Sequence, residues 1–459
     1  MDIDELQKPL QKRARTVKFP EFEGALLEWC LRAQGRIPLT DKLLVEKARS
    51  FANHFDTNMD AITFSNGWLR QFKKRHNLKQ IRMHGESGSV SELVIGETIT
   101  GLKQLTNNYA WKDIYNMDET GLFFRMEPDT TLATQQLAGK KKNKERLSVA
   151  LCCNGDGSHK LKPLVIGKNA KPRCFKNVKL ENLGVIYRYN KKAWMTAILF
   201  QEWLHYFDQQ MQGRQVLLLL DNAPSHVVAG VALNNTTIKF LPPNTTSRLQ
   251  PCDAGIIASF KAHYRRKFVR YLLEQFENEA TSGKLSILEA ILFIRESWQE
   301  DVTATTITNC FRHVKIRDED VVPEVESDNI EDEHEVTREI NRDLQLLCYQ
   351  HPMKVDDFLD PENENVIDEQ FTDEEIIELF CREREVEIED EDESSEPPPV
   401  SIKEATESLN KLIRFLLGQE GNYSKEIDNI MKVSRVLERL KVKSLVQKGL
   451  DDYFVIDEK

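Results

Sequence analysis

The sequence predicts a multidomain chain with an all-α N-terminal domain, an α/β core, an acidic disordered segment and a pair of C-terminal helices. Three observations predict this order. Apolar residues recur at helical spacing over 18–84, and short apolar runs that end in turn-forming residues follow over 111–315. A strongly acidic stretch at 316–400 then precedes two further helical stripes over 401–445. A length of 459 residues is enough for two or three domains.

The composition, with 40% hydrophobic and 30% charged residues, is typical of a soluble protein. No apolar run approaches the roughly 20 residues of a membrane helix, and the first residues lack the apolar stretch of a signal peptide. The net charge of −11 hides an uneven distribution, because residues 317–397 hold 32 Asp or Glu and 6 Lys or Arg, which leaves +15 on the rest of the chain. A basic body favours a nucleic-acid partner, and the acidic stretch is a competitor for the same basic face.

The cysteines favour a reducing compartment, and the N-terminal tail contains a candidate nuclear-import signal. We therefore expect the protein in the nucleus. Residues 1–17 form a polar tail, predicted to be disordered, whose Lys12-Arg13-Ala14-Arg15 cluster is either a nuclear-import signal or a solvated tail. The cysteines show no CxxC pair and no zinc-finger spacing, which favours free thiols. The eight are Cys30, Cys152, Cys153, Cys174, Cys252, Cys310, Cys348 and Cys381.

Three helices are predicted within 18–84. The first spans 21–34 and places its apolar residues on one stripe. The second begins after Thr40, and the third begins after Ser65, both of which are good N-cap residues. A Ser/Gly-rich linker at 85–110, which turns into a short amphipathic helix, separates these helices from the core.

The outer face of the third helix is suited to reading double-stranded DNA. Amide and guanidinium groups on its first turns read base edges, and the lysines and arginines that follow bind phosphate. The alternative is an ordinary solvated basic face. The candidate DNA-binding residues are Asn66, Arg70, Gln71, Lys73, Lys74 and Arg75.

Three aspartates follow short apolar runs in the core. The four leucines at 217–220 predict a buried strand that ends at Asp221, where α/β sheets place ligands. Asp118 follows a second apolar run, and Asp253 precedes a helix that begins near Gly255. Three carboxylates at such boundaries are able to share two divalent metals about 4 Å apart, and Mg²⁺ prefers these ligands. The alternative for Asp221 is a simple Asx-turn.

The other elements of the core have a recognisable order, in which antiparallel strands come first and helices then alternate with strands. Strands are predicted at 113–117, 146–153, 160–165, 184–189 and 238–241, and helices at 196–211, 256–271 and, with a break, 286–313. The helix after Asp253 carries a second basic surface formed by Lys261, His263, Arg265, Arg266, Lys267 and Arg270.

Three short stretches carry a resemblance to a known family. They are Asn-Met-Asp-Glu-Thr-Gly at 116–121, Asp-Asn-Ala-Pro-Ser-His at 221–226 and Leu-Gln-Pro-Cys-Asp-Ala-Gly at 249–255, with 31 residues between Asp221 and Asp253. They resemble the signature blocks of the DDE endonuclease of pogo/Tigger transposases and their centromere protein B relatives. The third helix resembles the second half of a centromere protein B-type helix-turn-helix. The family's first helix-turn-helix has no room upstream, so we expect weak, strongly salt-dependent DNA binding.

The resemblance implies an RNase H-like core in which Asp118, Asp221 and Asp253 bind Mg²⁺ or Mn²⁺. Their carboxyl carbons are then expected within about 8 Å of one another, with Asp118 bridging both ions. Glu119 and His226 are candidates for orienting these ligands or relaying a proton. Two hypotheses remain open: a metal-dependent DNA endonuclease and strand-transfer protein, or a domesticated nuclear DNA-binding protein without catalysis.

The C-terminal residues suggest two protein partners. The stripes of the 401–445 hairpin are too large for two helices to bury by themselves, which favours self-association into a homo-oligomer. Residues 446–459 contain the spacing Gln-x-x-Leu-x-x-aromatic-aromatic of a sliding-clamp binding box. The alternative is packing of the aromatic pair on the preceding helix. The motif residues are Gln447, Leu450, Tyr453 and Phe454.

Overall fold

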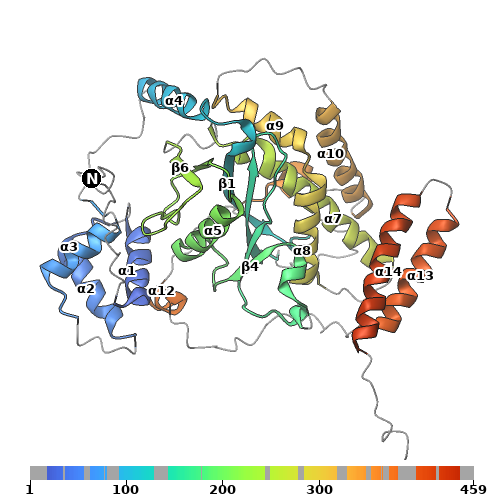
Figure 1. Cartoon of the computed structure of the whole chain (residues 1–459), viewed down its shortest axis with the longest axis horizontal. Coiled ribbons are helices and arrows are strands. Elements are labelled where there is room, and N and C mark those ends of the chain that lie inside the picture. Colours follow the sequence, from blue (N-terminus) through green and yellow to red (C-terminus); the bar gives the residue numbers. More distant parts are fainter. Residues whose placement is uncertain are drawn as a thin grey trace, which may run out of the picture. The chain divides into compact units, whose positions relative to one another are not determined.

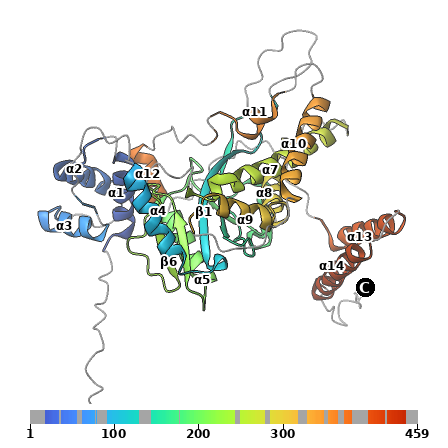
Figure 2. The same cartoon turned by 90° about the horizontal axis from the view of Figure 1, so that it is seen from above.

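A computed structural model describes the chain in two compact units, residues 1–394 and 395–459 (Figures 1 and 2). The described residues are 18–34, 37–55, 62–76, 78–79, 92–128, 143–176, 178–242, 249–277, 284–317, 328–347, 353–362, 364, 372–380, 400–419 and 423–444. The expectations for residues 1–17 and for the clamp motif Gln447, Leu450, Tyr453 and Phe454 lie outside them.

The N-terminal domain has the three predicted helices, α1 (Pro20–Ala33), α2 (Asp41–Ala52) and α3 (Asn66–Arg75). Both predicted N-caps are confirmed, because the Thr40 hydroxyl accepts from the Leu43 amide at 3.2 Å and the Ser65 hydroxyl from the Trp68 amide at 3.3 Å. The three helices share one apolar core. A further helix, α4 (Glu92–Thr106), follows where the linker was expected to become helical.

A six-stranded mixed sheet forms the centre of the first unit, in the order β4-β3-β2-β1-β5-β6 (Figure 1). Strand β1 lies antiparallel to β2 and parallel to β5, β2 lies antiparallel to β3, and the pairs β3–β4 and β5–β6 are parallel. The strands are β1 (Ile114–Phe123), β2 (Arg146–Asn154), β3 (Leu164–Gly167), β4 (Ile186–Tyr189), β5 (Val216–Leu220) and β6 (Thr236–Phe240).

Apolar side chains from helices cover both faces of this sheet. Leu218 and Leu220 of β5 pack with α5 (Ala197–Gln210), whereas Leu217 and Leu219 face the cluster that contains α7 (Ile257–Glu277). This two-sided burial explains why the leucine run has no polar alternation. The latter cluster also contains α8 (Ile287–Glu296) and α9 (Ala304–His313), with short turns η2 (Trp111–Asp113), η3 (Arg173–Phe175), η4 (Leu180–Leu183), η5 (Cys252–Ile256) and η6 (Ser297–Asp301) between the larger elements.

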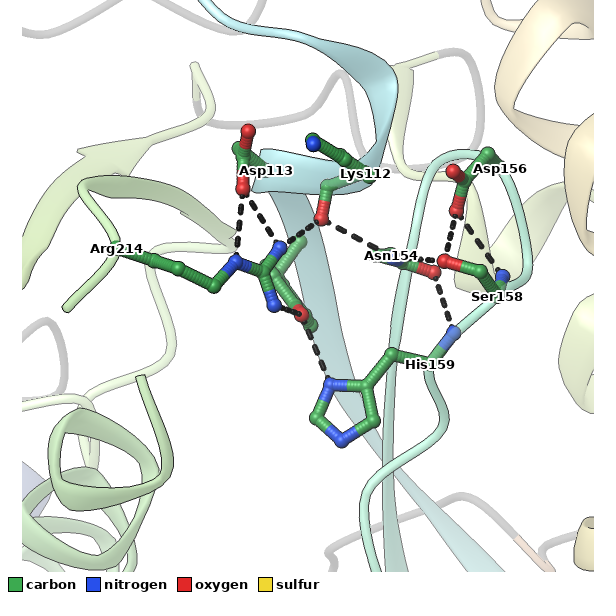
Figure 3. A network of polar contacts seen from close by, with 8 residues as sticks. Lys112, Asp113, Asn154, Asp156, Ser158, His159 and Arg214 are labelled. Carbon is green, nitrogen blue, oxygen red and sulfur yellow. Dashed lines mark hydrogen bonds and ion pairs between the residues drawn. The ribbon is translucent and has the colours of Figure 1, made fainter. Parts of the chain in front are cut away.

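A polar network fixes the beginning of β1 (Figure 3). The Arg214 guanidinium donates to Asp113 Oδ1 from Nε at 3.0 Å and from Nη2 at 2.6 Å, and its Nη1 donates to the Tyr115 hydroxyl at 3.1 Å. That hydroxyl also lies 2.9 Å from His159 Nδ1, and burial raises the pKa of Tyr115 to about 12. The Asn154 amide donates to the Lys112 carbonyl at 3.0 Å. The loops before β1, β3 and β5 are therefore held together.

The acidic stretch differs from its expected disorder wherever it is described. It forms α10 (Asp328–Leu347), α11 (Val355–Leu359) and α12 (Asp373–Phe380). Val336, Ile340 and Leu344 follow one another at spacings of four, so one face of α10 is apolar, and all three are buried in the cluster that contains α7. The expectation of disorder is wrong there, because this stripe buries enough surface to order an otherwise acidic chain. The helix suggested at 374–385 matches α12 as far as Phe380.

The second unit is the predicted helical hairpin, α13 (Ile402–Leu417) and α14 (Ser424–Ser444). A capping box joins Ser401 and Glu404 at its start. Several large apolar side chains remain at least 44% exposed within this unit: Leu412, Phe415, Leu417, Met431, Val433, Val436 and Leu440.

One smaller expectation, that of free thiols, is met by the part of the chain that is described. Its six cysteines, Cys30, Cys152, Cys153, Cys174, Cys252 and Cys310, are free and buried. None of its helices combines the length and the apolarity that crossing a membrane requires.

Candidate active site

The three aspartates of the predicted site come from three different elements. Asp118 lies in the middle of β1, opposite Leu151 of β2, rather than at the end of a strand as expected, because β1 continues to Phe123. Asp221 directly follows the last residue of β5, as predicted. Asp253 lies in η5, the single turn of π-helix that leads into α7. Asp118 is 8% exposed, so its carboxyl group is almost fully removed from bulk water.

One buried amide joins these three elements, and the sequence interpretation did not single it out. Asn116 precedes Asp118 by two residues on β1 and is fully buried. Its Nδ2 donates to the Leu219 carbonyl of β5 at 3.0 Å, and its Oδ1 accepts from the Cys252 amide of η5 at 2.8 Å. The side chain thus fixes β5 and η5 against β1. An asparagine within the first signature stretch was the available signal.

The carboxyl groups of Asp118 and Asp253 are hydrogen-bonded to each other. Burial raises the pKa of Asp118 well above its ordinary value, and the negative charges of Asp253, Glu119 and Asp221 raise it further. Burial and the charge of Asp221 also raise the pKa of Asp253, against a lowering effect of its hydrogen bond with Asp118. The site therefore favours the protonated form of this pair more than water does for isolated carboxyl groups.

His226 connects the two remaining acidic residues of the site. Its Nδ1 lies 2.7 Å from Asp221 Oδ1, and its Nε2 lies 3.0 Å from Glu119 Oε1. Burial of the imidazole lowers its pKa, but the charge of Glu119 and the hydrogen bonds to Asp221 and Glu119 outweigh burial, so the pKa of His226 is raised well above its ordinary value. The ring packs on Phe200 of α5, with centroids 4.5 Å apart.

Asp221 differs from the other two aspartates because its pKa is lowered whereas theirs are raised. Burial raises the pKa of Asp221, but the hydrogen bond and charge of His226 and the Ala223 amide lower it below its usual range. Glu119 and His226, predicted to lie beside the carboxylates, are thus brought together with Asp221. Their charge favours an imidazolium between two carboxylates.

The donor set fits a hard divalent cation. Asp118, Asp253 and Asp221 offer carboxylate oxygens in one partly dehydrated place, and the repulsion among them is what a cation relieves. Within the described residues, no group of three His, Cys, Asp or Glu side chains is arranged to hold a metal ion. The fit therefore rests on the chemistry of the donors, and metal binding would require these side chains to move. A cation would replace the shared proton of the pair.

The six candidate DNA-binding residues of α3 divide into two sets. Asn66, Arg70, Gln71 and Lys74 are exposed. Lys73, by contrast, donates to Asp41 Oδ1 at 2.7 Å.

Arg75 is tied into its own domain. It donates from Nε to Glu23 Oε2 at 3.0 Å, and His76 Nε2 lies 3.2 Å from the same oxygen. Burial raises the pKa of Glu23, but these two partners lower it below its ordinary value. Arg75 therefore stabilises the domain rather than offering a free charge to DNA.

The basic surface predicted on α7 is wrong for three of its six residues. Lys261, His263 and Arg265 are buried at 4%, 6% and 0% exposure. Lys261 Nζ and Arg265 Nη2 pair with Glu364 at 2.6 and 2.5 Å, and Glu364 is itself fully buried.

The other three cations of α7 are also paired with acids. Arg266 and Arg270 reach Glu339 of α10 at 3.2 and 3.0 Å, and Lys267 reaches Asp301 at 3.1 Å. The charges on this face of α7 are therefore paired with acids, two of them with Glu339 of the acidic stretch, rather than left for DNA.

Comparison with known proteins identifies the two domains that contain these sites. Residues 144–311 match the family model of the DDE superfamily endonuclease, and residues 19–82 match that of the Tc5 transposase DNA-binding domain. The chain is 31% identical over 445 residues to CENP-B homolog protein 2 of Schizosaccharomyces pombe, which covers 93% of this chain and 85% of that protein. It is 33% identical to Tigger transposable element-derived protein 4 of Mus musculus over 67% of this chain and 60% of that protein. The chain belongs to the pogo/Tigger family of transposase-derived proteins.

This pogo/Tigger protein is also similar to a solved structure. The catalytic domain of Mos1 mariner transposase is 14% identical and covers 51% of this chain and 100% of that domain, with a TM-score of 0.26. That score is too low to transfer any geometry between the two sites.

The endonuclease model of the family begins after Asp118. It includes Asp221 and Asp253 but not the first aspartate, whose position beside them rests on the contacts described above. In this pogo/Tigger chain, β1 and its Asn116 therefore carry the evidence that a third carboxylate joins the site.

Proposed function

We propose that this protein binds double-stranded DNA through α3 and cleaves or joins DNA strands at Asp118, Asp221 and Asp253. The observation that supports cleavage best is the convergence of carboxylates from three separate elements, with Asn116 joining those elements. Three acidic side chains crowded together cost stability unless a cation or a proton compensates them. Because this crowding is unfavourable for folding, a catalytic role explains the site better than a purely structural role does.

Each residue of the site has a definite task in this proposal. Asp118, Asp221 and Asp253 would hold Mg²⁺ or Mn²⁺. Such ions would supply activation of a water or a 3′-hydroxyl and stabilisation of the leaving oxygen. His226 orients the Asp221 carboxylate through the 2.7 Å contact, and Glu119 holds the imidazole from its other side at 3.0 Å. Burial of the Asp118 carboxyl excludes competing water from one side of the reaction.

A specific observation also supports the second candidate, a nuclear DNA-binding protein without catalysis. Asp118 is hydrogen-bonded to Asp253, and Asp221 is paired with His226, so the site is satisfied by its own side chains. Relatives of this chain include proteins named for a homology to centromere protein B and, in one case, for binding an ARS element. Such a role would use α3 alone.

A plasmid-nicking assay with the full chain separates the two candidates. Supercoiled DNA is incubated with protein and either Mg²⁺, Mn²⁺ or a chelator, and the variants are Asp221→Asn and, as a matched control, Glu202→Asn on the exposed side of α5. Catalysis predicts nicking that needs metal, survives in the control and disappears in Asp221→Asn. Intact DNA binding with no nicking under any metal condition supports the second candidate.

We further propose that the hairpin α13–α14 associates with a second copy of itself. Large apolar side chains such as Phe415 and Leu417 are 61% and 69% exposed, and two helices offer no second layer to cover them. Sedimentation equilibrium of the wild type should show an oligomer that Phe415→Glu shifts toward monomer. A monomeric wild type at micromolar concentration would exclude this.

The nucleus and the sliding clamp remain proposals that rest on sequence. A DNA partner and the relatives named above support a nuclear location, which a fluorescent fusion would test. The clamp motif is tested by calorimetry of a peptide covering 443–459 against purified clamp. Binding should be lost in Tyr453→Ala and Phe454→Ala, and heat that survives both changes would rule the motif out.

A further inference from the structure

Helix α12 is an acidic amphipathic helix taken from the middle of the acidic stretch. Its sequence, Asp-Glu-Glu-Ile-Ile-Glu-Leu-Phe, contains four carboxylates and no basic residue. Ile376, Ile377 and Phe380 are 1%, 5% and 4% exposed, so its apolar face is covered almost completely. These three belong to the core of the DNA-binding domain, not to the core of the sheet.

The surface that receives α12 is shaped for it. Helix α12 packs on α1, and a Cβ atom at Gly24 would overlap the ring of Phe380. Only glycine leaves that space, so Phe380 fills a hole in the surface of α1. The contact is thus specific in shape and not merely apolar.

Basic residues from two different parts of the first unit surround the same helix. Lys47 of α2 pairs with Asp373 at 2.5 Å, and its ammonium lies 5.1 Å from the centroid of the Trp29 ring. Lys192, which precedes α5 in the core, pairs with Glu375 at 3.4 Å, and its neighbour Lys191 pairs with Glu378. One face of α12 therefore contacts the DNA-binding domain, and its charges reach both that domain and the core.

We propose that the surface around Gly24 and Lys47 is a binding site for an acidic amphipathic helix, and that α12 occupies it in cis as a clasp between the DNA-binding domain and the core. The domain also contacts the core directly: the Glu28 carboxylate accepts from the Ala197 amide at 3.1 Å, and Trp194, Ile198 and Val227 pack with the domain's apolar cluster. The clasp adds to these contacts in holding α3 relative to the sheet. The clasp does not depend on whether the protein cleaves DNA.

The clasp does not cover the candidate DNA face. Asn66, Arg70, Gln71 and Lys74 of α3 stay exposed while α12 is bound. Its ion pairs are partly exposed, with Lys47 at 21% and Asp373 at 36%, so salt screens them. Release of α12 would therefore change the position of the DNA-binding domain without unmasking or hiding α3.

The first test uses amide hydrogen exchange of the full chain. In the wild type the amides of 376–380 should be protected, and Phe380→Ala should remove that protection while leaving β1 and β5 unchanged. Glu374→Gln, an exposed position on the same helix, is the matched control and should retain protection. Rapid exchange of α12 in the wild type, or unchanged protection in Phe380→Ala, would overturn the clasp.

The second test adds the helix in trans. A fluorescent peptide covering 370–383 is titrated into the full-length Phe380→Asp variant, whose own α12 no longer fills the hole over Gly24. The peptide should bind this variant about tenfold or more tighter than the wild type, whose site is occupied. Adding Gly24→Leu to the variant should abolish binding.

A charge swap keeps the proposal testable if either of these variants folds poorly. Lys47→Glu should lower the protection of α12, and Lys47→Glu with Asp373→Lys should restore it, because the ion pair is rebuilt in reverse. Equal peptide binding by wild type, Phe380→Asp and the Gly24→Leu variant, or no restoration by the swap, would show that the site does not exist.

Discussion

Two sets of carboxylates lie along β1, one fully buried and one only partly buried, and they are compensated in opposite ways. At the end of the strand, Glu364 is fully buried, but Lys261, Arg265 and the Phe123 amide all donate to it. In the middle of the strand, Asp118 meets Asp253, Glu119 and Asp221, and none of the described lysines or arginines pairs with it. A carboxylate that lysine and arginine neutralise serves the fold, whereas a cluster that lacks these two cations, called uncompensated below, is a place for a metal ion.

The largest effect is expected from breaking the compensated set. Glu364→Ala removes the carboxylate that neutralises the buried Lys261 and Arg265, which costs about 3–5 kcal/mol of stability. Urea unfolding should show the loss, and Glu362→Ala, an exposed neighbour, should change stability by less than about 0.5 kcal/mol. Equal stability of wild type and Glu364→Ala would mean that the ionic cluster does not support β1.

The uncompensated set should respond to metal instead. Mg²⁺ at about 100 times its dissociation constant should stabilise the protein by about 2.7 kcal/mol, because it binds only the folded state. Thermal unfolding with and without Mg²⁺ measures this. The gain should vanish in Asp118→Asn and Asp253→Asn but persist in Glu364→Gln. A gain that persists in both aspartate variants would place the cation elsewhere.

Without metal, Asp118 should make the protein less stable as the pH rises. Its folded pKa is raised, so its protonated form is favoured in the folded state, and that stability is present below the unfolded pKa of an aspartate. It is lost as the pH rises toward and through the folded pKa. Unfolding in chelator across this window should show a fall in the wild type that is shallower in Asp118→Asn. The same slope in both proteins would contradict the contacts described for this carboxyl.

The smallest effect is expected on α3, where one lysine is paired with an acid and its neighbour is exposed. Lys74 is exposed, whereas Lys73 is already paired with Asp41. Lys74→Ala should weaken binding to any DNA duplex and reduce the salt dependence by about one ion, and Lys73→Ala should do less. Arg70→Ala should instead reduce preference among sequences. Anisotropy titrations at several salt concentrations measure all three, and a larger effect of Lys73→Ala would reverse the assignment.

Sequence patterns predicted the elements that carry local signals. The N-caps Thr40 and Ser65, the leucine strand before Asp221 and the helical hairpin all come from residues near one another in the chain. The middle of β1 was missed because Asp118 and Glu119 are poor strand formers, and pairing with the neighbouring strand β2 keeps the chain extended there.

The partners of α7 could not be predicted from its own sequence. Lys261 and Arg265 look like a basic surface because Glu364, which neutralises them, lies about a hundred residues downstream. The spacing of Val336, Ile340 and Leu344 was a usable signal for α10, but the acidic composition around it favoured disorder. Charge counts describe a segment on average, whereas a few buried residues decide whether it folds.

Helices α10 and α11 pack into the sheet's main apolar cluster through Val336, Ile340, Leu344 and Phe358. This packing determines where the chain should be truncated for experiments. The endonuclease family model ends at residue 311, which invites an expression fragment with a C-terminus near that position. Such a fragment would expose the apolar surface that α10 and α11 cover, and it would leave Arg265 facing no acid. A loss of solubility or activity in this fragment would then result from the exposed apolar core. It would not report the effect of removing the negative charge.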